Sequence, residues 1–501
     1  ALISVWLYFI YHLRREYIIS FKNLLETSHT KKEKNDRKEI PVTSIVDTVI
    51  RVFYSGEEGQ ILHMLQKTLE VKNERFFYAI KGLLEHESAE VRALAIENLY
   101  FLKSQNLSFQ METMVFDKDQ HVTTAAFRYL LKNYDNDTLE LFNKYLNSPD
   151  TTIANASLIG LSLELRNNPK LQERFSLVNR IGLALDQYET LTAQKERRNK
   201  MIAILEAIGN AKVERYYNII KEQLNATDMD LLKAAIISAS KSLDKDFIEL
   251  IVPHLSKKDT RKTATDALFN FGEPIMDIMV NTIRMENIDL EDAIYIVPVI
   301  EKFASQKAIN ILIKITEDTE HAIKIEAIEA LKRLKWKHPN LKIRDRFVVD
   351  KILDECHLYQ NTLSVIHSQI VIQYKKKDQS PETLQENEAR NGLIHLLEQR
   401  LDRQLQRIFR FLGIKYPPND IDSILNTILN GKEEQRVHAV EFLENILDKQ
   451  LKKDLIPVAE STLMETISEE QIKKLNLKVF SESECYHALL IRKDVKLKQA
   501  V

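Results

Sequence analysis

The stretch that most constrains the fold is LLEHESAEVRALAIENL, residues Leu83–Leu99. The pattern predicts the end of one helix, a short polar turn and the start of a second helix. Ser88 is placed to cap the second helix, and Glu90 puts an acidic side chain in its first turn. One apolar face is predicted at helical spacing by Val91, Leu94, Ala95 and Leu99. The unit recurs with drift along most of the chain, which is typical of a helical solenoid.

Related helix pairs are predicted along the whole sequence. They lie at Phe76–Leu99, Phe116–Leu131, Leu141–Leu163, Tyr216–Ser240, Ile248–Gly272, Ala308–Leu334 and Ser423–Leu447. Their irregular spacing, roughly thirty to forty-five residues, is in the range of two-helix repeats. Only 10 Gly and 11 Pro occur among 501 residues, which favours helices joined by short polar turns. We therefore expect an all-α protein, a right-handed solenoid of stacked helical hairpins, with Gly272 ending one of the helices.

The chain starts with an apolar run of eleven residues that only Ser4 interrupts. As a helix this run spans about 17 Å, roughly half of a bilayer core. We expect the end of a transmembrane helix here, with Trp6, Tyr8, Tyr11, Arg14 and Arg15 at the membrane interface. The alternative is an ordinary amphipathic first helix of the solenoid. Because the sequence lacks an initiator Met and stops inside a predicted helix, we expect a piece of a longer protein.

These patterns predict five regions. They are the transmembrane helix end and its exit (1–20), a charged linker (21–40), repeats (41–344), a long helical hairpin (345–412), and further repeats cut at the C-terminus (413–501). In the hairpin we expect a helix around Val348–Gln373, a polar loop at Lys375–Glu388 and a second helix at Gly392–Leu412.

Several segments carry a family resemblance. Leu83–Leu99 resembles HEAT repeats, and Phe409–Glu460 joins the segment FLGIKYPPNDI to a repeat that ends in EFLENIL. Trp6–Leu25 places Arg-Arg-Glu-Tyr directly after the apolar run, and Ile296–Ile315 and Ala330–Leu341 also match. On these residues the chain resembles the cytoplasmic HEAT-repeat region of bacterial membrane proteins related to ATP/ADP translocases, of the major facilitator type.

The resemblance implies a HEAT-like α-solenoid attached to a transporter in the bacterial inner membrane, with the repeats in the cytoplasm. It implies that the partner is the chain's own upstream membrane domain. The position of Arg14 and Arg15 directly after the apolar run indicates anionic lipid as a second partner. Members of the family can carry a cyclic-nucleotide-binding domain after the repeats. The translocase residues that bind nucleotide would precede Ala1, so none is assigned here. The charges, 71 Lys and Arg against 73 Asp and Glu, give no case for nucleic-acid binding.

The sequence offers no catalytic, cofactor-binding or metal-binding site that we can identify. It contains no glycine-rich phosphate loop, and GEEG at Gly56–Gly59 is typical of a turn. Cys356 and Cys485 are far apart in sequence and fit a reducing compartment. Neither Cys356, beside His357 and near His367, nor Cys485, near His487, has the ligands or partners of a zinc site or a nucleophile.

Two basic runs, Lys195–Lys200 and Lys375–Lys377, are either solvated surface or contacts for anionic lipid. A stripe of Arg400, Arg403, Arg407 and Arg410 is interpreted as a salt-linked surface, paired with Glu398 and Asp402, or else as a groove for a partner. Tyr416, Pro417 and Pro418 are interpreted as a structural motif that reverses the chain, since two prolines end the preceding helix. A proline-rich ligand for another domain is the alternative.

The sequence thus predicts a non-enzymatic arm that binds a partner or transmits the state of a membrane transporter. A second hypothesis is a soluble HEAT-repeat adaptor with no transporter. A third is a HEAT-like lyase of the phycobilin type, for which the sequence shows no catalytic cluster.

Overall fold

The computed structural model describes residues 45–133, 138–166, 169–285, 288–318, 320–375, 381–463 and 469–490. All regular elements in these ranges are helices, which confirms the all-α prediction. The chain forms two compact units, residues 1–244 and 245–501, and each is described below by itself. The expected transmembrane helix end (1–20) and charged linker (21–40) lie outside the described residues.

Unit 1 is a series of short helices. They are α2 (Ile45–Ser55), α3 (Glu58–Val71), α4 (Phe77–Gly82), α5 (Ala89–Leu99), α6 (Ser108–Met114), α7 (Gln120–Asn133), α8 (Thr138–Leu146), α9 (Thr151–Leu165), α10 (Pro169–Arg174), α11 (Leu177–Thr190), α12 (Gln194–Ala211), α13 (Tyr217–Gln223) and α14 (Met229–Ser242), with single 3-10 turns at Glu74–Phe76, Leu83–Glu85 and Glu214–Tyr216.

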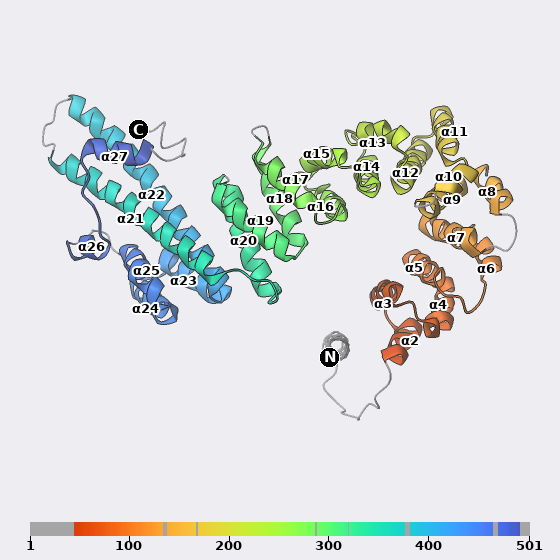
Figure 1. Cartoon of the computed structure of the whole chain (residues 1–501), viewed down its shortest axis with the longest axis horizontal. Helices are drawn as coiled ribbons and strands as arrows, with labels where there is room; N and C mark the ends of the chain where they lie inside the picture. The colour runs from red at the N-terminus through yellow and green to blue at the C-terminus, as the bar shows by residue number, and fades with distance from the viewer. Residues whose placement is uncertain are drawn as a thin grey trace, which may run out of the picture. The chain divides into compact units, whose positions relative to one another are not determined.

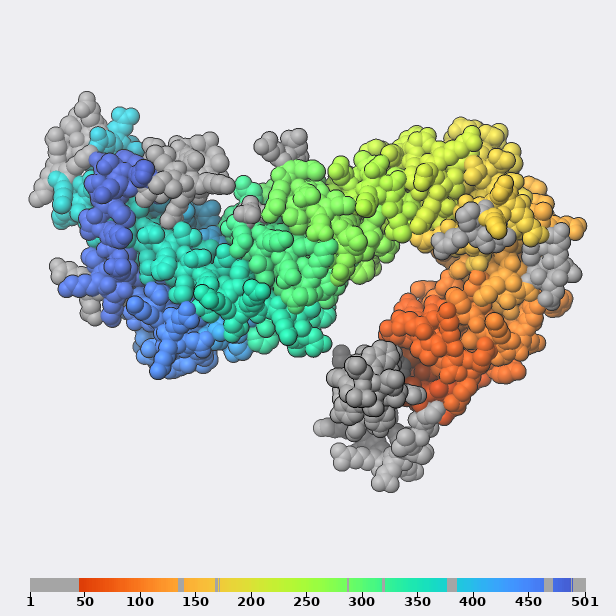
Figure 2. All heavy atoms as spheres, in the orientation of Figure 1, coloured from red at the N-terminus to blue at the C-terminus, as the bar shows by residue number. Residues whose placement is uncertain are grey.

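The helices of unit 1 lie in two rows (Figure 1). In the first, which we call the stacking row, α3, α5, α7, α9, α12 and α14 each pack against the next. In the second, the covering row, α2, α4, α6, α8, α11 and α13 pack on α3, α5, α7, α9, α12 and α14, in that order. Neighbours in sequence are neighbours in space, so the colours of unit 1 follow one another in order in Figure 2. This is the architecture of an α-solenoid.

The second helix of the opening motif, α5, is buried on more than one face. Val91, Ala95 and Leu99 are fully buried as predicted, whereas Leu94 is only half-buried. Ile96 is fully buried as well, because α5 packs against α3, α4 and α7 at once. The single apolar face predicted from the spacing is therefore too narrow, since a helix between neighbours needs apolar residues around most of its surface.

Aspartates cap several helices, but the predicted cap of α5 makes no such bond. Ser88 occupies the cap position without a side-chain hydrogen bond, and its own N–H donates to Nδ1 of His86 at 3.1 Å. Asp150 and Asp228 do accept from the first turns of α9 and α14, at 2.8 and 2.9 Å. A carboxylate there satisfies free N–H groups and interacts favourably with the helix dipole.

Glycines allow two pairs of stacking helices to approach closely. A Cβ atom on Gly209 of α12 would lie 2.5 Å from the carbonyl oxygen of Ser238 in α14. A Cβ atom on Gly160 of α9 would lie 3.1 Å from Cβ of Phe127 in α7. The contact at Gly209 is with backbone atoms, so only glycine fits there without displacement, whereas at Gly160 a Cβ atom would require its neighbours to shift by a few tenths of an ångström.

Unit 2 continues with helix pairs and then much longer helices. The elements are α15 (Asp246–Ile251), a 3-10 turn (Val252–His254), α16 (Arg261–Asn270), α17 (Ile275–Ile283), α18 (Leu290–Lys302), α19 (Gln306–Asp318), α20 (His321–Lys337), α21 (Asp345–Lys375), α22 (Pro381–Lys415), α23 (Pro418–Asn430), α24 (Glu433–Ile446), α25 (Lys449–Ser461), α26 (Glu469–Lys474) and α27 (Glu482–Leu490).

The stacking row of unit 2 consists of α16, α18, α20 and α22, with α15, α17, α19 and α21 covering them. Gly272 follows α16 with a φ of +80°, the left-handed conformation expected of a residue that ends a helix. The long helices α21 and α22 pack along each other, and α25 and α27 pack on α21. A polar loop was expected over Lys375–Glu388, but α22 already begins within that range at Pro381, because proline suits the first helical turn.

Within the described ranges, no helix is both long enough and apolar enough to span a bilayer.

Candidate functional site

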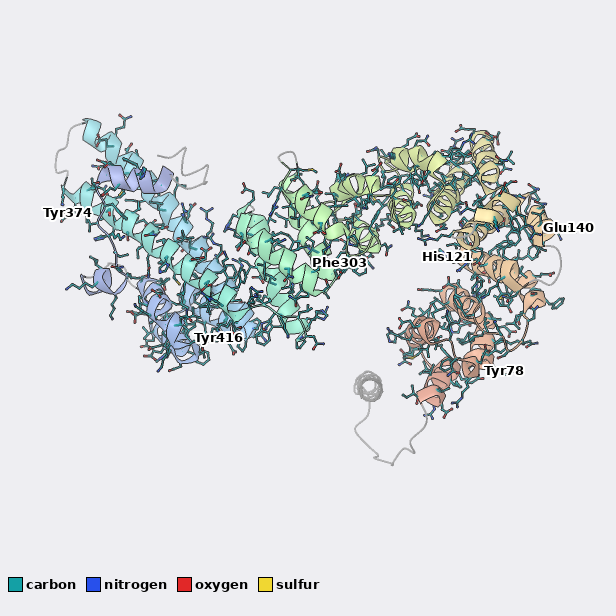
Figure 3. The ribbon with its side chains drawn as sticks, in the orientation of Figure 1. Tyr78, His121, Glu140, Phe303, Tyr374 and Tyr416 are labelled. Carbon is teal, nitrogen blue, oxygen red and sulfur yellow. The ribbon has the colours of Figure 1, made fainter. Side chains whose placement is uncertain are left out.

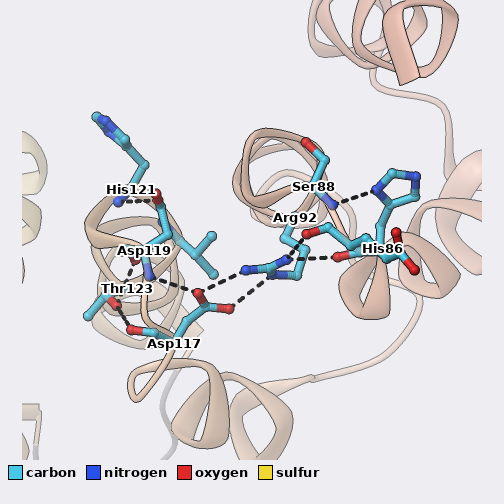
Figure 4. A network of polar contacts seen from close by, with 9 residues as sticks. His86, Ser88, Arg92, Asp117, Asp119, His121 and Thr123 are labelled. Atoms are coloured by element: carbon cyan, nitrogen blue, oxygen red, sulfur yellow. Dashed lines mark hydrogen bonds and ion pairs between the residues drawn. The ribbon is translucent and has the colours of Figure 1, made fainter. Parts of the chain in front are cut away.

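Polar side chains bridge successive helices of the stacking row in unit 1 (Figure 4). Arg92, near the start of α5, donates from Nη1 to the carbonyl oxygens of His86 and Glu87, at 2.8 and 2.9 Å. Its Nε and Nη2 donate to the two carboxylate oxygens of Asp117, both at 2.9 Å. Asp117 lies in the turn before α7, so one guanidinium ties together the turns that precede two neighbouring helices.

Asp117 also orders its own turn. Its carboxylate accepts a hydrogen bond from the N–H of Asp119 at 2.9 Å, and Asp119 accepts one from the N–H of His121 at 2.9 Å. Burial raises the pKa of the Asp117 carboxyl, but the hydrogen bonds from Arg92 and from the backbone outweigh burial and hold it below its ordinary value. The bridge is therefore a pair of full charges at neutral pH.

The arginine bridge to the preceding turn recurs in unit 2. Arg261 at the start of α16 donates to the carbonyl oxygens of Leu255 and Ser256, at 2.9 and 2.6 Å. As with Arg92, these carbonyls belong to the residues six and five positions earlier. The guanidinium of Arg261 also lies over the ring of Tyr295, 3.7 Å from its centroid.

Buried amides and hydroxyls add further bridges in unit 1. Asn98 of α5 accepts from Oγ1 of Thr68 in α3 at 2.8 Å and donates to the carbonyl oxygen of Leu65 at 3.0 Å. Asn210 of α12 donates to Oγ of Ser162 in α9 at 3.2 Å. Sequence analysis missed these residues, because a polar residue among apolar ones gives no sign of which neighbour it will bond.

The basic run Lys195–Lys200 is neither a loop nor a continuous surface patch, because it forms the first turns of α12. Arg197 donates to the carbonyl oxygens of Tyr188 and Leu191, at 3.1 and 2.9 Å. Arg198 forms an ion pair with Asp230 at 3.3 Å. Lys200, in contrast, is only 5% exposed.

Lys200 lies at a groove of about 390 Å³ in unit 1. The groove is formed by residues of α8, α9, α11 and α12. Its apolar lining comes from Leu146, Ala154, Leu158, Leu183 and Ala184, and its polar lining from Asn147, Arg180, Asp186, Gln187, Thr190 and Lys200. A partly apolar groove of this size with a few charged groups is the usual form of a binding site.

Two arginines of the α22 stripe, Arg407 and Arg410, form ion pairs, but with other partners than expected. Arg407 makes a bidentate ion pair with Glu355 of α21, at 2.9 and 2.8 Å, and Arg410 bonds Glu329 of α20 at 3.0 Å. The predicted partner Glu398 instead lies 3.7 Å from His395. Sequence spacing indicated pairs within one helix, whereas the packing of α20, α21 and α22 supplies carboxylates from neighbouring helices.

His321 adjoins this network, with Nδ1 3.1 Å from Nη1 of Arg407. Burial lowers the pKa of His321 to about 4, and the charges of Arg407 and Arg403 contribute to the shift. The imidazole is therefore neutral at physiological pH.

Tyr416, which Figure 3 labels, and Pro417 lie between α22 and α23, and Pro418 follows them directly. Helix α22 ends at Lys415, and Pro418 starts α23. The hydroxyl of Tyr416 accepts a hydrogen bond from the N–H of Asp448 at 3.1 Å. The segment thus joins two helices and also holds the turn before α25.

Both cysteines are buried and free. Burial is the main cause that raises the pKa of the Cys356 and Cys485 thiols, which makes them poor nucleophiles. Cys485 packs with Leu393, Leu397 and Leu489 in an apolar cluster. In the part of the chain that the structure describes, no group of three or more His, Cys, Asp or Glu is arranged to hold a metal ion.

The membrane-interface candidates Trp6, Tyr8, Tyr11, Arg14 and Arg15 lie outside the described residues.

No protein-family model matches the chain, and no curated protein matches it. Solved structures do match, at low identity and low TM-score. An engineered protein shares 15% identity over 46% of this chain and 97% of its own, with a TM-score of 0.23. Importin beta shares 11% over 90% of this chain and 61% of its own, with a TM-score of 0.25. The complex of CpcE and CpcF of phycocyanin lyase from Nostoc shares 15% over 63% of this chain and 96% of its own, with a TM-score of 0.21.

Because these scores are low, the assignment as a helical-repeat solenoid rests on the helix packing described above. None of the comparisons links the chain to ATP/ADP translocases.

Proposed function

We propose that this chain is a non-enzymatic interaction arm that presents a row of helices to a protein partner. The observation that carries the proposal is a set of exposed aromatic side chains on successive helices of the covering row in unit 1. Tyr54 of α2 is 68% exposed, Tyr78 of α4 is 69% exposed and Phe109 of α6 is 86% exposed. Large exposed aromatic groups are typical of interfaces, where they contribute much of the binding energy.

The bridges of the stacking row support the same proposal. Arg92–Asp117 and Thr68–Asn98 tie neighbouring helices together, so the covering helices sit on a fixed base. A surface that is fixed before binding loses less conformational entropy when a partner docks.

The partner we propose is the membrane domain upstream of Ala1, in a transporter resembling ATP/ADP translocases, located in the bacterial inner membrane with the repeats in the cytoplasm. This rests on the resemblance of Trp6–Leu25 and Phe409–Glu460 to that family. Arg14 and Arg15 would then contact anionic lipid at the membrane surface. The alternative is a soluble adaptor that docks a different protein on the same aromatic side chains.

The test uses the natural full-length protein expressed in its own host. A photo-crosslinking amino acid replaces Tyr78, and in a matched control it replaces Glu222, which is exposed on α13. The proposal expects the protein in membranes washed with alkaline carbonate and crosslinks from position 78 to a membrane-domain peptide, with few from position 222. Recovery in the soluble fraction with crosslinks to a separate protein would favour the adaptor. Equal and scattered crosslinks from both positions would contradict an interaction surface at the aromatic side chains.

A further inference from the structure

The groove between α8, α9, α11 and α12 contains a buried cation, Lys200, whose hydrogen-bond partner is a neutral amide. Lys200 is 5% exposed, and its Nζ donates to Oε1 of Gln187 at 2.9 Å. Within the described residues no carboxylate lies close enough to form an ion pair with it. Burial lowers the pKa of this ammonium. An ammonium held away from water beside a single amide oxygen has donors to spare, and it is costly to bury without an anion.

A second cation lines the same groove. Arg180 of α11 donates from Nε to the carbonyl oxygen of Phe175 at 2.6 Å and from Nη2 to Oδ1 of Asn143. Both partners are neutral, so the guanidinium charge is not compensated by a carboxylate among the described residues. These two bonds fix the guanidinium while leaving Nη1 available.

The remaining side chains of the groove determine which charge and size of anion would fit. Among the described lining residues Asp186 carries the one carboxylate, so Arg180, Lys200 and Asp186 together give this lining one positive charge. A monoanion neutralises this charge, whereas a dianion would exceed it. The apolar side chains of Leu146, Leu158 and Leu183 offer a hydrocarbon surface beside the cations, and a volume of about 390 Å³ suits a small ligand.

We infer that this groove binds a small amphipathic carboxylate, with the carboxylate on Lys200 and Arg180 and the hydrocarbon part on the leucines. A charge-assisted hydrogen bond to a desolvated ammonium is stronger than one in water. This inference does not depend on the proposed interaction arm, because it concerns a groove between helices and not the exposed aromatic side chains.

The test is isothermal titration calorimetry of the full chain with 4-phenylbutyrate, and with 4-phenyl-1-butanol as the uncharged analogue. Acetyl-glycyl-phenylalanine and its carboxamide form a second acid and uncharged pair. Comparing the two acids shows whether the groove prefers the C-terminal carboxylate of a peptide or the carboxylate of a simple phenylalkyl acid. We expect at least one of the two acids to bind, and its uncharged counterpart to bind at least about tenfold more weakly. Absence of binding by both acids, or equal binding of acid and uncharged analogue, would overturn the inference.

Variants locate the site. Lys200→Met keeps the apolar stem and should weaken acid binding at least about tenfold. Lys195→Met, at an exposed position in the first turn of α12, should leave it unchanged. Asp186→Asn removes a like charge and should tighten binding about two- to fivefold. Circular dichroism melting checks that each variant folds. If Lys200→Met folds and binds as tightly as the wild type, or if Lys195→Met loses as much affinity, the carboxylate is not held by Lys200.

Discussion

Replacing Gly209 with alanine tests the close contact between α12 and α14. The added Cβ atom would lie 2.5 Å from the carbonyl oxygen of Ser238 and 2.7 Å from its Cα atom. These are backbone atoms of a neighbouring helix, so no side-chain rotation relieves the contact, and the two helices must separate.

The change that Gly209→Ala causes in the free energy of unfolding is the sum of two opposing contributions. Overpacking of this kind costs about 3 kcal/mol, and the better helix propensity of alanine returns about 1 kcal/mol. The expected net loss is about 2 kcal/mol in the free energy of unfolding, which for a unit of this size lowers the melting temperature by about 4–8 °C.

The assay is differential scanning calorimetry of wild type and variant, with Gly82→Ala as the matched control in the same unit. Gly82 has an ordinary helical φ of −61°, and a Cβ atom there meets nothing within 4 Å. We expect this control to be neutral or to stabilise by up to about 1 kcal/mol. A Gly209→Ala protein that melts at or above the wild-type temperature would refute the close packing of α12 on α14.

Two further predictions concern the polar bridges. Asn98→Ala removes two buried hydrogen bonds, one from the Thr68 hydroxyl and one to the carbonyl oxygen of Leu65, and should cost about 1–3 kcal/mol in urea unfolding. No loss of stability would mean that Asn98 does not bridge α3 and α5. The second prediction concerns His321, whose pKa is about 4 in the folded chain and 6.5 in its ordinary state. As the pH falls, the unfolded chain therefore binds a proton at His321 at a higher pH than the folded chain does. The free energy of unfolding consequently falls as the pH drops from about 6.5 towards 4. Melting curves across this range should show a smaller loss for His321→Asn than for the wild type, and identical pH profiles would contradict a buried neutral imidazole.

The fold class could be predicted from the sequence because helical spacing and scarce Gly and Pro determine it locally. The pair around Leu83–Leu99 and the left-handed Gly272 follow from such local rules. The extent of burial could not be predicted, because α5 packs against three helices and apolar spacing reveals only one face.

The bridges and the groove were harder to predict from sequence. The Arg407–Glu355 pair joins residues 52 positions apart, so spacing within one helix suggested the wrong partners. Lys200 belongs to the basic run Lys195–Lys200, which was interpreted from its composition as solvated surface or as a contact for anionic lipid. Because successive residues of a helix face different directions, Lys200 of α12 is buried at the groove, while Arg198 forms an ion pair with Asp230 of α14. Only tertiary packing separates these roles.

The proposed interaction surface depends on stacked helices held in register by side-chain bridges. The most direct test is a double-mutant cycle of Arg92→Met and Asp117→Asn, measured by urea unfolding. The two side chains are 17% and 14% exposed and form two hydrogen bonds of 2.9 Å. The predicted coupling energy is about 1–3 kcal/mol. A coupling energy near zero would show that Arg92 and Asp117 do not join the turns before α5 and α7, and would contradict the bridged stacking row.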